Sequence, residues 1–433
     1  MATKPDLIDF VRGDATGLSI PAHPDALLRA GAGFLTEAFR AYGSLSRNNA
    51  VARITRVEPW LAGNSGEKLV LSVEYEQEDS RLDTELFVKF SRYFPDAFRD
   101  RRRYELEPEV SLAALSRLPA FPVTVARPYF ADFNHETGTG VLITQRIAFG
   151  ENGVEPLHRK CMDHELADPV PYYRATVTAL ARLAGAHKAG RLSPQVEELF
   201  PFDLDAAMAE MPIPWDEEQI AEKAALIGEF AKTCPKLLPS NVASEQFLAR
   251  LKRDAPRFVR HERAIRRFLL GNPDYVALTH WNTNIDNAWF WRDADGTMQC
   301  GLLDWGMVRQ MNLAYGLWGG LSASDTAMLD RHLAGLLELF AEELAAEGGP
   351  RLDPAELGLH FDLSVAMLGL ALMADAPALI LSRVPDAAQA AGPHDPLIMQ
   401  DQVAHGFLHV FANFLDTWER RDFGASLDRM LER

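Results

Sequence analysis

The chain has 433 residues, a formal net charge of −17 and 47% hydrophobic residues, proportions that fit a globular protein of two or three domains. This acidic balance argues against nucleic acid as a partner, because phosphate backbones bind basic surfaces. The first residues lack the apolar core of a signal peptide, and no stretch approaches the roughly 20 apolar residues of a membrane span. Three scattered cysteines form no disulfide framework. We therefore expect a cytoplasmic protein without a membrane partner.

Residues 1–50 are expected to form a helical extension, because apolar residues recur at helical spacing between Pro24 and Tyr42. Residues 51–150 change period, and strands are predicted at Ile54–Leu61 and Leu69–Tyr75. The connection between these strands contains Gly63, Ser65 and Gly66. Glycine lets backbone N–H groups approach a phosphate closely, so this hairpin is a candidate phosphate loop. A plain hairpin without a ligand is the alternative interpretation.

A third predicted strand, Glu85–Phe90, carries Lys89 between apolar neighbours. Burying an ammonium group is costly unless it is paired. Lys89 is therefore either exposed on an edge strand or paired with a glutamate and with nucleotide phosphates. The helix that follows places Glu109 inward, as the expected partner, with Glu105 and Glu107 as alternatives. A favourable charge at the helix N-terminus is the other explanation for Glu109.

Two more predicted strands, Phe121–Tyr129 and Gly140–Ile147, complete a small sheet, and a glycine-rich connector follows as a candidate hinge. Residues 151–433 are expected to form a mainly helical domain. Helices are predicted at Pro171–Lys188, Leu248–Leu270, Ala323–Ala346, Pro354–Ala374 and Ile398–Arg420. The second of these is rich in arginine. A solvated face that balances local acids is the simpler interpretation, and a surface for an acidic partner is the alternative.

Two apolar runs, Ala288–Trp291 and Cys300–Leu303, flank a turn that contains Asp and Gly, which predicts a β-hairpin. A polar loop precedes the first strand, and an aspartate follows the second. The polar side chains concerned are His280, Asn282, Asp286, Asn287 and Asp304. We expect the hairpin to bring Asn287 and Asp304 to one edge, an arrangement that can hold magnesium over a nucleoside triphosphate.

The order of these motifs resembles the aminoglycoside phosphotransferase and choline kinase-like family over Ile54–Leu321. The most specific pieces are the loop His280-x-Asn282-x-x-x-x-Asn287 and the pair Asp304-Trp305. The resemblance implies an α+β, bilobal protein-kinase-like fold, with a small antiparallel-sheet N-lobe and a large, mainly helical C-lobe.

The same resemblance implies ATP and Mg²⁺ as cofactors. Asn287 and Asp304 would bind the metal, and Lys89 would hold the phosphates. The connector after the sheet would receive the adenine, and a histidine would support the catalytic loop. Gln145 and Ile147 are the residues at the adenine position, and His280 is the histidine of the loop.

The chain departs from the family at the catalytic loop. The family motif is His-Gly-Asp, whose Asp accepts the proton of the substrate hydroxyl, whereas this chain has Trp281 and Asn282. Gly316 stands where the family usually has an Asp that braces the loop. An amide can orient a hydroxyl but cannot take its proton at neutral pH. Asp286 is the fallback base if the loop is rearranged.

Two functions follow from these residues. The first is a phosphotransferase that moves the γ-phosphate of ATP to a hydroxyl of a small molecule, with a cationic or apolar acceptor that Trp281 could cover. The second is a catalytically impaired pseudokinase that binds nucleotide or ligand as a sensor or scaffold. A mainly helical protein that binds no nucleotide is a third interpretation.

Overall fold

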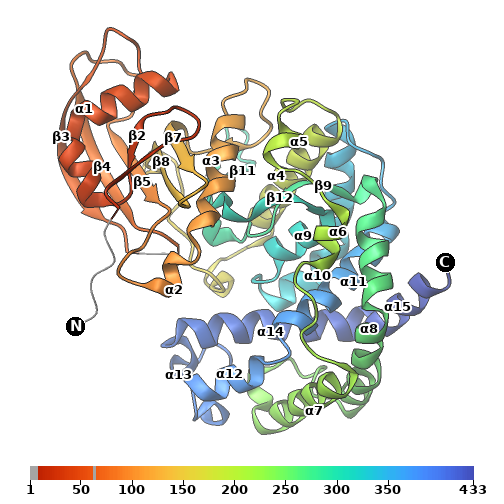
Figure 1. The fold of residues 1–433 in the computed structure, drawn as a ribbon. Helices are drawn as coiled ribbons and strands as arrows, with labels where there is room; N and C mark the ends of the chain where they lie inside the picture. The colour runs from red at the N-terminus through yellow and green to blue at the C-terminus, as the bar shows by residue number, and fades with distance from the viewer. Residues whose placement is uncertain (1–7, 62–64) are drawn as a thin grey trace. The chain divides into compact units, whose positions relative to one another are not determined.

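The computed structural model describes residues 8–61 and 65–433, and these form two compact units. The sheet unit contains the chain up to Glu155 together with Leu192–Phe200 and Gly301–Val308. The helical unit contains Pro156–Arg191, Pro201–Cys300 and Arg309–Arg433. The predicted α+β class is confirmed, because one unit is built on an antiparallel sheet and the other is mainly helical (Figure 1).

Five antiparallel strands form the sheet of the sheet unit, in the order β3-β4-β5-β8-β7. Their bounds are Val51–Pro59 for β3, Lys68–Tyr75 for β4, Glu85–Phe90 for β5, Pro128–Asn134 for β7 and Thr139–Gln145 for β8. β5 is the middle strand, so both of its edges are paired and its side chains alternate between the two faces. This position decides how Lys89 is placed.

The predicted strand Phe121–Tyr129 is wrong in its extent. The chain forms the short strand β6 (Thr124–Val125) and then starts β7 at Pro128. Proline has no backbone N–H to donate to a sheet ladder, so it begins a strand more readily than it continues one. β6 pairs in parallel with Gly301 and Leu302.

Helix α1 (Pro24–Tyr42) covers part of this sheet and packs against β3 and β7 (Figure 1). Gly43 ends the helix with φ 79°, a left-handed conformation that glycine adopts without steric cost. A small hairpin of β1 (Phe10–Arg12) and β2 (Ser19–Pro21), which the sequence pattern does not predict, precedes it. The sheet unit also contains the helices α2 (Ala97–Asp100), α3 (Leu106–Leu115) and α5 (Val196–Leu199), and α3 packs against β7 and β8.

The helical unit is organised around α11 (Pro354–Leu372), which packs against α8, α9, α14 and α15. α11 is the one helix of the described residues that is long and apolar enough to cross a membrane, but 78% of its apolar window is buried, as in a core helix. The other helices are α4 (Val170–Lys188), α6 (Leu204–Ala209), α7 (Glu217–Thr233), α8 (Glu245–Gly271), α9 (Leu313–Leu321), α10 (Thr326–Ala346), α12 (Ala376–Arg383), α13 (Pro396–Met399), α14 (Gln402–Arg421) and α15 (Phe423–Leu431).

The single helix predicted over Ile398–Arg420 is wrong, because α13 ends at Met399 and α14 begins at Gln402. Asp401 separates the two helices. Its carboxylate accepts a hydrogen bond from Ala404 N at 2.9 Å and pairs with Arg383 at 2.8 Å. An aspartate that caps an N-terminus fixes where a helix starts.

The predicted hairpin is present as β10 (Ala288–Arg292) and β11 (Met298–Leu302), with Asp293 N donating to Thr297 O at 3.1 Å. A second strand pair, β9 (Val276–His280) with β12 (Val308–Asn312), lies nearby in sequence. β9 leads into the polar loop, so this pair fixes one end of that loop.

The arginines of α8 are largely balanced by acids within the helical unit. Arg260 pairs with Glu217, and Arg257 pairs with Asp254 and Asp428. These contacts favour the simpler interpretation of the basic helix, a solvated face that offsets local acidic groups.

Two helix glycines give a matched test of packing. A Cβ added at Gly369 in α11 would meet the ring of buried Phe414 at 2.1 Å, whereas one at Gly335 in α10 would meet nothing within 4 Å. We expect Gly369→Ala to lower the free energy of unfolding by about 1–3 kcal/mol through overpacking. Gly335→Ala should raise it by about 0.5–1 kcal/mol, because alanine is the better helix former. Chemical denaturation checks both, and equal effects would contradict the packing.

Candidate active site

Lys89 is buried, with 5% of its surface exposed, on the middle strand of the sheet unit. Its ammonium group contacts the carboxylate of Glu109 and lies 2.8 Å from Asp304 Oδ1. The alternative of an exposed lysine on an edge strand is wrong, because β4 and β8 pair with both edges of β5. The expected partner, Glu109, is present, and Asp304 is a second acid on the same cation.

Glu109 faces inward from the first turn of α3 and is 6% exposed. Burial, as the largest cause, and the charge of Asp304 raise the pKa of its carboxyl, whereas Lys89 lowers it, and the resulting pKa is about 7. The opposite balance holds for Lys89. Burial would lower the pKa of its ammonium group, but the two carboxylates raise it well above the usual range, so this lysine stays charged.

Asp304 follows β11 with φ 56° and ψ 57°, in the left-handed region that aspartate tolerates better than most residues. The turn Trp305–Met307 comes next, and Trp305 Nε1 donates to Leu302 O at 3.0 Å. A Cβ at Gly306 would lie 2.8 Å from Glu105 O, so glycine lets this turn lie against α3. The Asp304 side chain keeps 47% of its surface exposed, in contrast to Glu109.

Gly63 lies outside the described residues, whereas Ser65 and Gly66 lie just before β4. Gly66 has φ 49°, and a Cβ there would lie 1.7 Å from Phe90 O. The glycine therefore permits a close approach of two backbone segments at the end of β5. That approach alone explains the residue, and a role for Ser65 and Gly66 in phosphate binding stays a prediction.

Gln145 ends β8, and its side-chain oxygen accepts a hydrogen bond from Arg127 N at 3.0 Å. Ile147 follows in the irregular segment after the strand. The predicted contact of Gln145 and Ile147 with adenine stays a prediction.

In the helical unit, the polar loop is held by its own amide groups. His280 is fully buried at the end of β9, and Asn282 N donates to its Nδ1 at 3.3 Å. Asn287 Nδ2 donates to Asn282 O at 2.9 Å, and Asn284 Nδ2 donates to Asn282 Oδ1 at 3.1 Å. The loop therefore brings His280, Asn282 and Asn287 together, with Asp286 in its last turn. A supporting role for His280 fits this arrangement.

Three glycines of α9 let this loop lie directly on the helix, and sequence reasoning had singled out only Gly316 among them. A Cβ would meet Thr279 Oγ1 at 2.5 Å from Gly316, Trp281 O at 1.6 Å from Gly319, and Thr283 Oγ1 at 2.5 Å from Gly320. Their spacing, i, i+3 and i+4, puts them on one helix face and is the signal that could have found them. Thr279 occupies the space where a longer side chain at position 316 would stand.

The structure thus groups the predicted residues in two sets. Lys89, Glu109 and Asp304 meet in the sheet unit, whereas Asn287 belongs to the helical unit, so the convergence of Asn287 and Asp304 on one metal stays a prediction. Within residues 8–61 and 65–433, no group of three or more His, Cys, Asp or Glu side chains could hold a metal ion. Magnesium, however, is usually bound by one or two carboxylates together with substrate phosphates and water.

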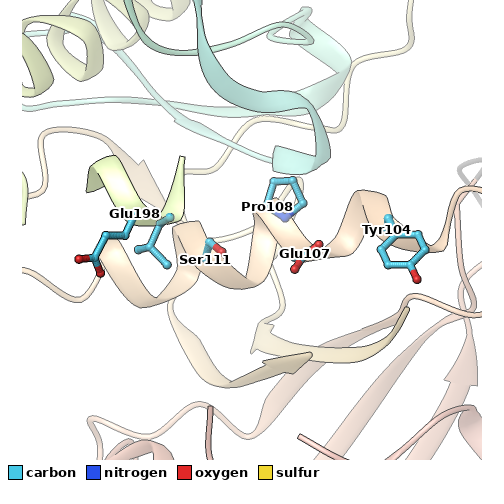
Figure 2. Close-up of a pocket in the computed structure, with 6 residues that line it drawn as sticks. Tyr104, Glu107, Pro108, Ser111 and Glu198 are labelled. Atoms are coloured by element: carbon cyan, nitrogen blue, oxygen red, sulfur yellow. The ribbon is translucent and has the colours of Figure 1, made fainter. Parts of the chain in front are cut away.

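A separate cavity of about 300 Å³ lies beside another face of α3, in the sheet unit (Figure 2). Its lining residues are Tyr104, Glu107, Pro108, Ser111, Glu198 and Leu199. Glu107 is already engaged there by His135 at 2.8 Å. The cavity shares no lining residue with the Lys89 cluster, so we do not include it in the candidate active site.

Lys89→Met tests the charge cluster. Breaking a buried ion pair at one partner typically costs about 3–5 kcal/mol, and we expect a loss of this size in the free energy of unfolding at pH 8. At pH 5.5 the loss should be smaller. Burial already raises the pKa of Glu109 to about 7 while Lys89 lowers it, so without Lys89 the carboxyl of the folded variant is protonated there and no longer leaves an unpaired buried charge.

Urea denaturation at both pH values measures the effect. The control is Lys232→Met, which removes an exposed pair with Glu229 and should cost below about 1 kcal/mol. An equal loss for Lys89→Met at both pH values would show that Glu109 does not titrate in this range.

Among known proteins, the matches to this chain are solved structures. No family model matches the chain, and no curated protein matches it. A choline/ethanolamine kinase family protein from Mesorhizobium loti is 15% identical, with 88% of this chain and 93% of that chain covered and a TM-score of 0.41.

Two further structures are similar to this chain. A microcompartment-associated aminopropanol kinase is 12% identical, with 91% of this chain and 99% of that chain covered and a TM-score of 0.42. A spectinomycin phosphotransferase in complex with ADP and spectinomycin is 10% identical, with 88% of this chain and 94% of that chain covered and a TM-score of 0.36. All three TM-scores lie below 0.5, so the function proposed next depends on the geometry of this chain's own residues.

Proposed function

We propose that the protein is an ATP- and Mg²⁺-dependent phosphotransferase that acts on a hydroxyl of a small molecule. The observation that carries the proposal is the buried Lys89, held by Glu109 and Asp304 on the middle strand of the sheet unit. A buried ion pair contributes little net stability, so its presence calls for another purpose. A charged, oriented ammonium group beside a partly exposed carboxylate suits the binding of a nucleotide's phosphates and metal.

The donor set fits both cofactors. Lys89 would hold the phosphates, with backbone N–H groups near Ser65 and Gly66 in support, and Asp304 with Asn287 would supply hard oxygen ligands for magnesium. Bound magnesium supplies neutralisation of the charge on the phosphoryl oxygens. Of the two acids on Lys89, Asp304 is the accessible one, with 47% of its side chain exposed against 6% for Glu109.

In the helical unit, Asn282 would orient the acceptor hydroxyl by hydrogen bonding. Phosphoryl transfer passes through a loose transition state and depends mostly on positioning and charge stabilisation. A general base contributes roughly 10²–10⁴-fold, so transfer without one is slowed but not abolished. Trp281 in this loop would cover an apolar or cationic acceptor.

The three cysteines are free and buried, as is usual in the reducing cytoplasm, and we propose that the protein is cytoplasmic.

A pseudokinase that binds nucleotide or ligand as a sensor or scaffold is the second candidate. Asn282 Oδ1 already accepts a hydrogen bond from Asn284, and Thr279 fills the space beside Gly316. The loop is therefore built around amide groups, with no acid at the position of the family's base.

Thermal unfolding with and without Mg-ATP separates the nucleotide-binding functions from the rest. A ligand at 100 times its Kd stabilises the folded state by about 2.7 kcal/mol, so a clear rise in Tm is expected at millimolar Mg-ATP. The absence of a shift would count against both candidates. ADP production over a panel of hydroxylated metabolites then distinguishes a phosphotransferase from a pseudokinase.

Asn282→Asp should raise the transfer rate, by up to roughly 10²–10⁴-fold if the new carboxylate acts as the base. Steady-state ADP release measures it, and the ATP-induced rise in Tm should be unchanged. Asp286→Asn is the matched variant. An unchanged rate in Asn282→Asp, together with a loss in Asp286→Asn, would assign the base to Asp286.

A further inference from the structure

We propose that Lys68 is a second phosphate-binding cation of the nucleotide site. This inference rests on the function proposed above. Lys68 is not among the phosphate-binding residues predicted from the sequence. Every contact that supports the proposal lies within the sheet unit.

Lys68 begins β4 and stands directly opposite Lys89 of β5 in the antiparallel register. Directly opposed residues of an antiparallel pair project from the same face of the sheet, and like charges in this relation destabilise the pair. The two acids near this face, Glu109 and Asp304, both contact Lys89. The arrangement therefore brings a second positive charge to a face whose acids are already engaged.

The contacts of Lys68 leave its charge without an ionic partner among residues 8–61 and 65–433. Its ammonium group donates to the backbone oxygen of Ser65, beside the hairpin glycine Gly66. A carbonyl oxygen accepts a hydrogen bond but carries no full charge. A polyphosphate offers several charged oxygens, and it would supply the missing counter-charge between the hairpin and Lys89.

Electrostatics give this cation a pH dependence that Lys89 lacks. Burial lowers the pKa of Lys68 to about 8, and Lys89 and Arg99 lower it as well, whereas Asp304 and Glu109 raise it. Free Lys68 thus loses its proton between pH 7 and 9, whereas Lys89, whose pKa is raised, keeps its own. Binding that requires charged Lys68 takes up a proton above pH 8, so affinity falls as pH rises.

Stability and affinity should respond in opposite directions to the loss of Lys68. In the folded protein without nucleotide, a partly buried ammonium group opposed to Lys89 is unfavourable at pH 7. Lys68→Met should therefore leave the Tm unchanged or raise it while weakening binding of Mg-ATP. A lysine that only supports the Ser65 turn would instead lower the Tm when removed and leave the pH profile of binding intact.

Calorimetric titration of the full chain with Mg-ATP, between pH 7 and 9, tests the proposal. For one group with a pKa of about 8, the wild-type affinity should fall about tenfold over this range. Lys68→Met should bind at least several-fold more weakly at pH 7 and show no such decline. Lys68→Arg should keep the affinity and also lose the decline, because a guanidinium group stays charged.

A second readout is proton uptake, measured at pH 8.5 from the binding enthalpies in two buffers of different ionisation enthalpy. The wild type and the exposed control Lys232→Met should take up part of a proton on binding, whereas Lys68→Met and Lys68→Arg should take up none. Wild-type affinity and uptake in Lys68→Met would overturn this inference alone. An absence of Mg-ATP binding by the wild type would instead overturn the proposed function.

Discussion

The ammonium group of Lys89, buried between two carboxylates, is the constraint on which the sheet unit depends. A charge at 5% exposure is tolerated only where partners are fixed around it. Three separate pieces of chain fix them: the middle strand β5, the first turn of α3, and the left-handed residue Asp304 after β11. Gly306 completes the arrangement, because a side chain there would push the turn after Asp304 away from α3.

The helical unit holds its polar loop by a different kind of contact. Its loop rests on a face of α9 made of glycines, and the loop's amide groups bond to one another rather than to a buried charge. Close backbone packing of this kind, together with the hydrogen bond from Asn282 N to the Nδ1 of buried His280, fixes where the loop's side chains lie. The charge cluster of the sheet unit, by contrast, contains a glutamate with a pKa of about 7 and a lysine with a pKa of about 8.

The sequence predicts what local periodicity and charge burial control. The strand carrying Lys89 and the helix Pro24–Tyr42 were predicted with the bounds that the structure has, and a buried lysine needs an acid, which led to Glu109. Strand register is not visible in one sequence, so the opposition of Lys68 and Lys89 was missed. The left-handed backbone of Asp304 depends on tertiary contacts, which local patterns do not carry. The break at Asp401 has a local signal, an aspartate that caps α14, but the apolar periodicity on both sides of it favours one helix.

Under the proposed function, nucleotide binding and phosphoryl transfer depend on different residues of the chain. Binding energy for a polyphosphate comes from charge, and in the sheet unit Lys68 stands opposite Lys89, which contacts two acids. Transfer to a hydroxyl is faster with a proton acceptor, and the loop has the amide of Asn282 at the position proposed for the base. A general base raises the rate of transfer but contributes almost nothing to nucleotide affinity. Under the proposed function, affinity for Mg-ATP and turnover therefore depend on different residues and have to be measured separately.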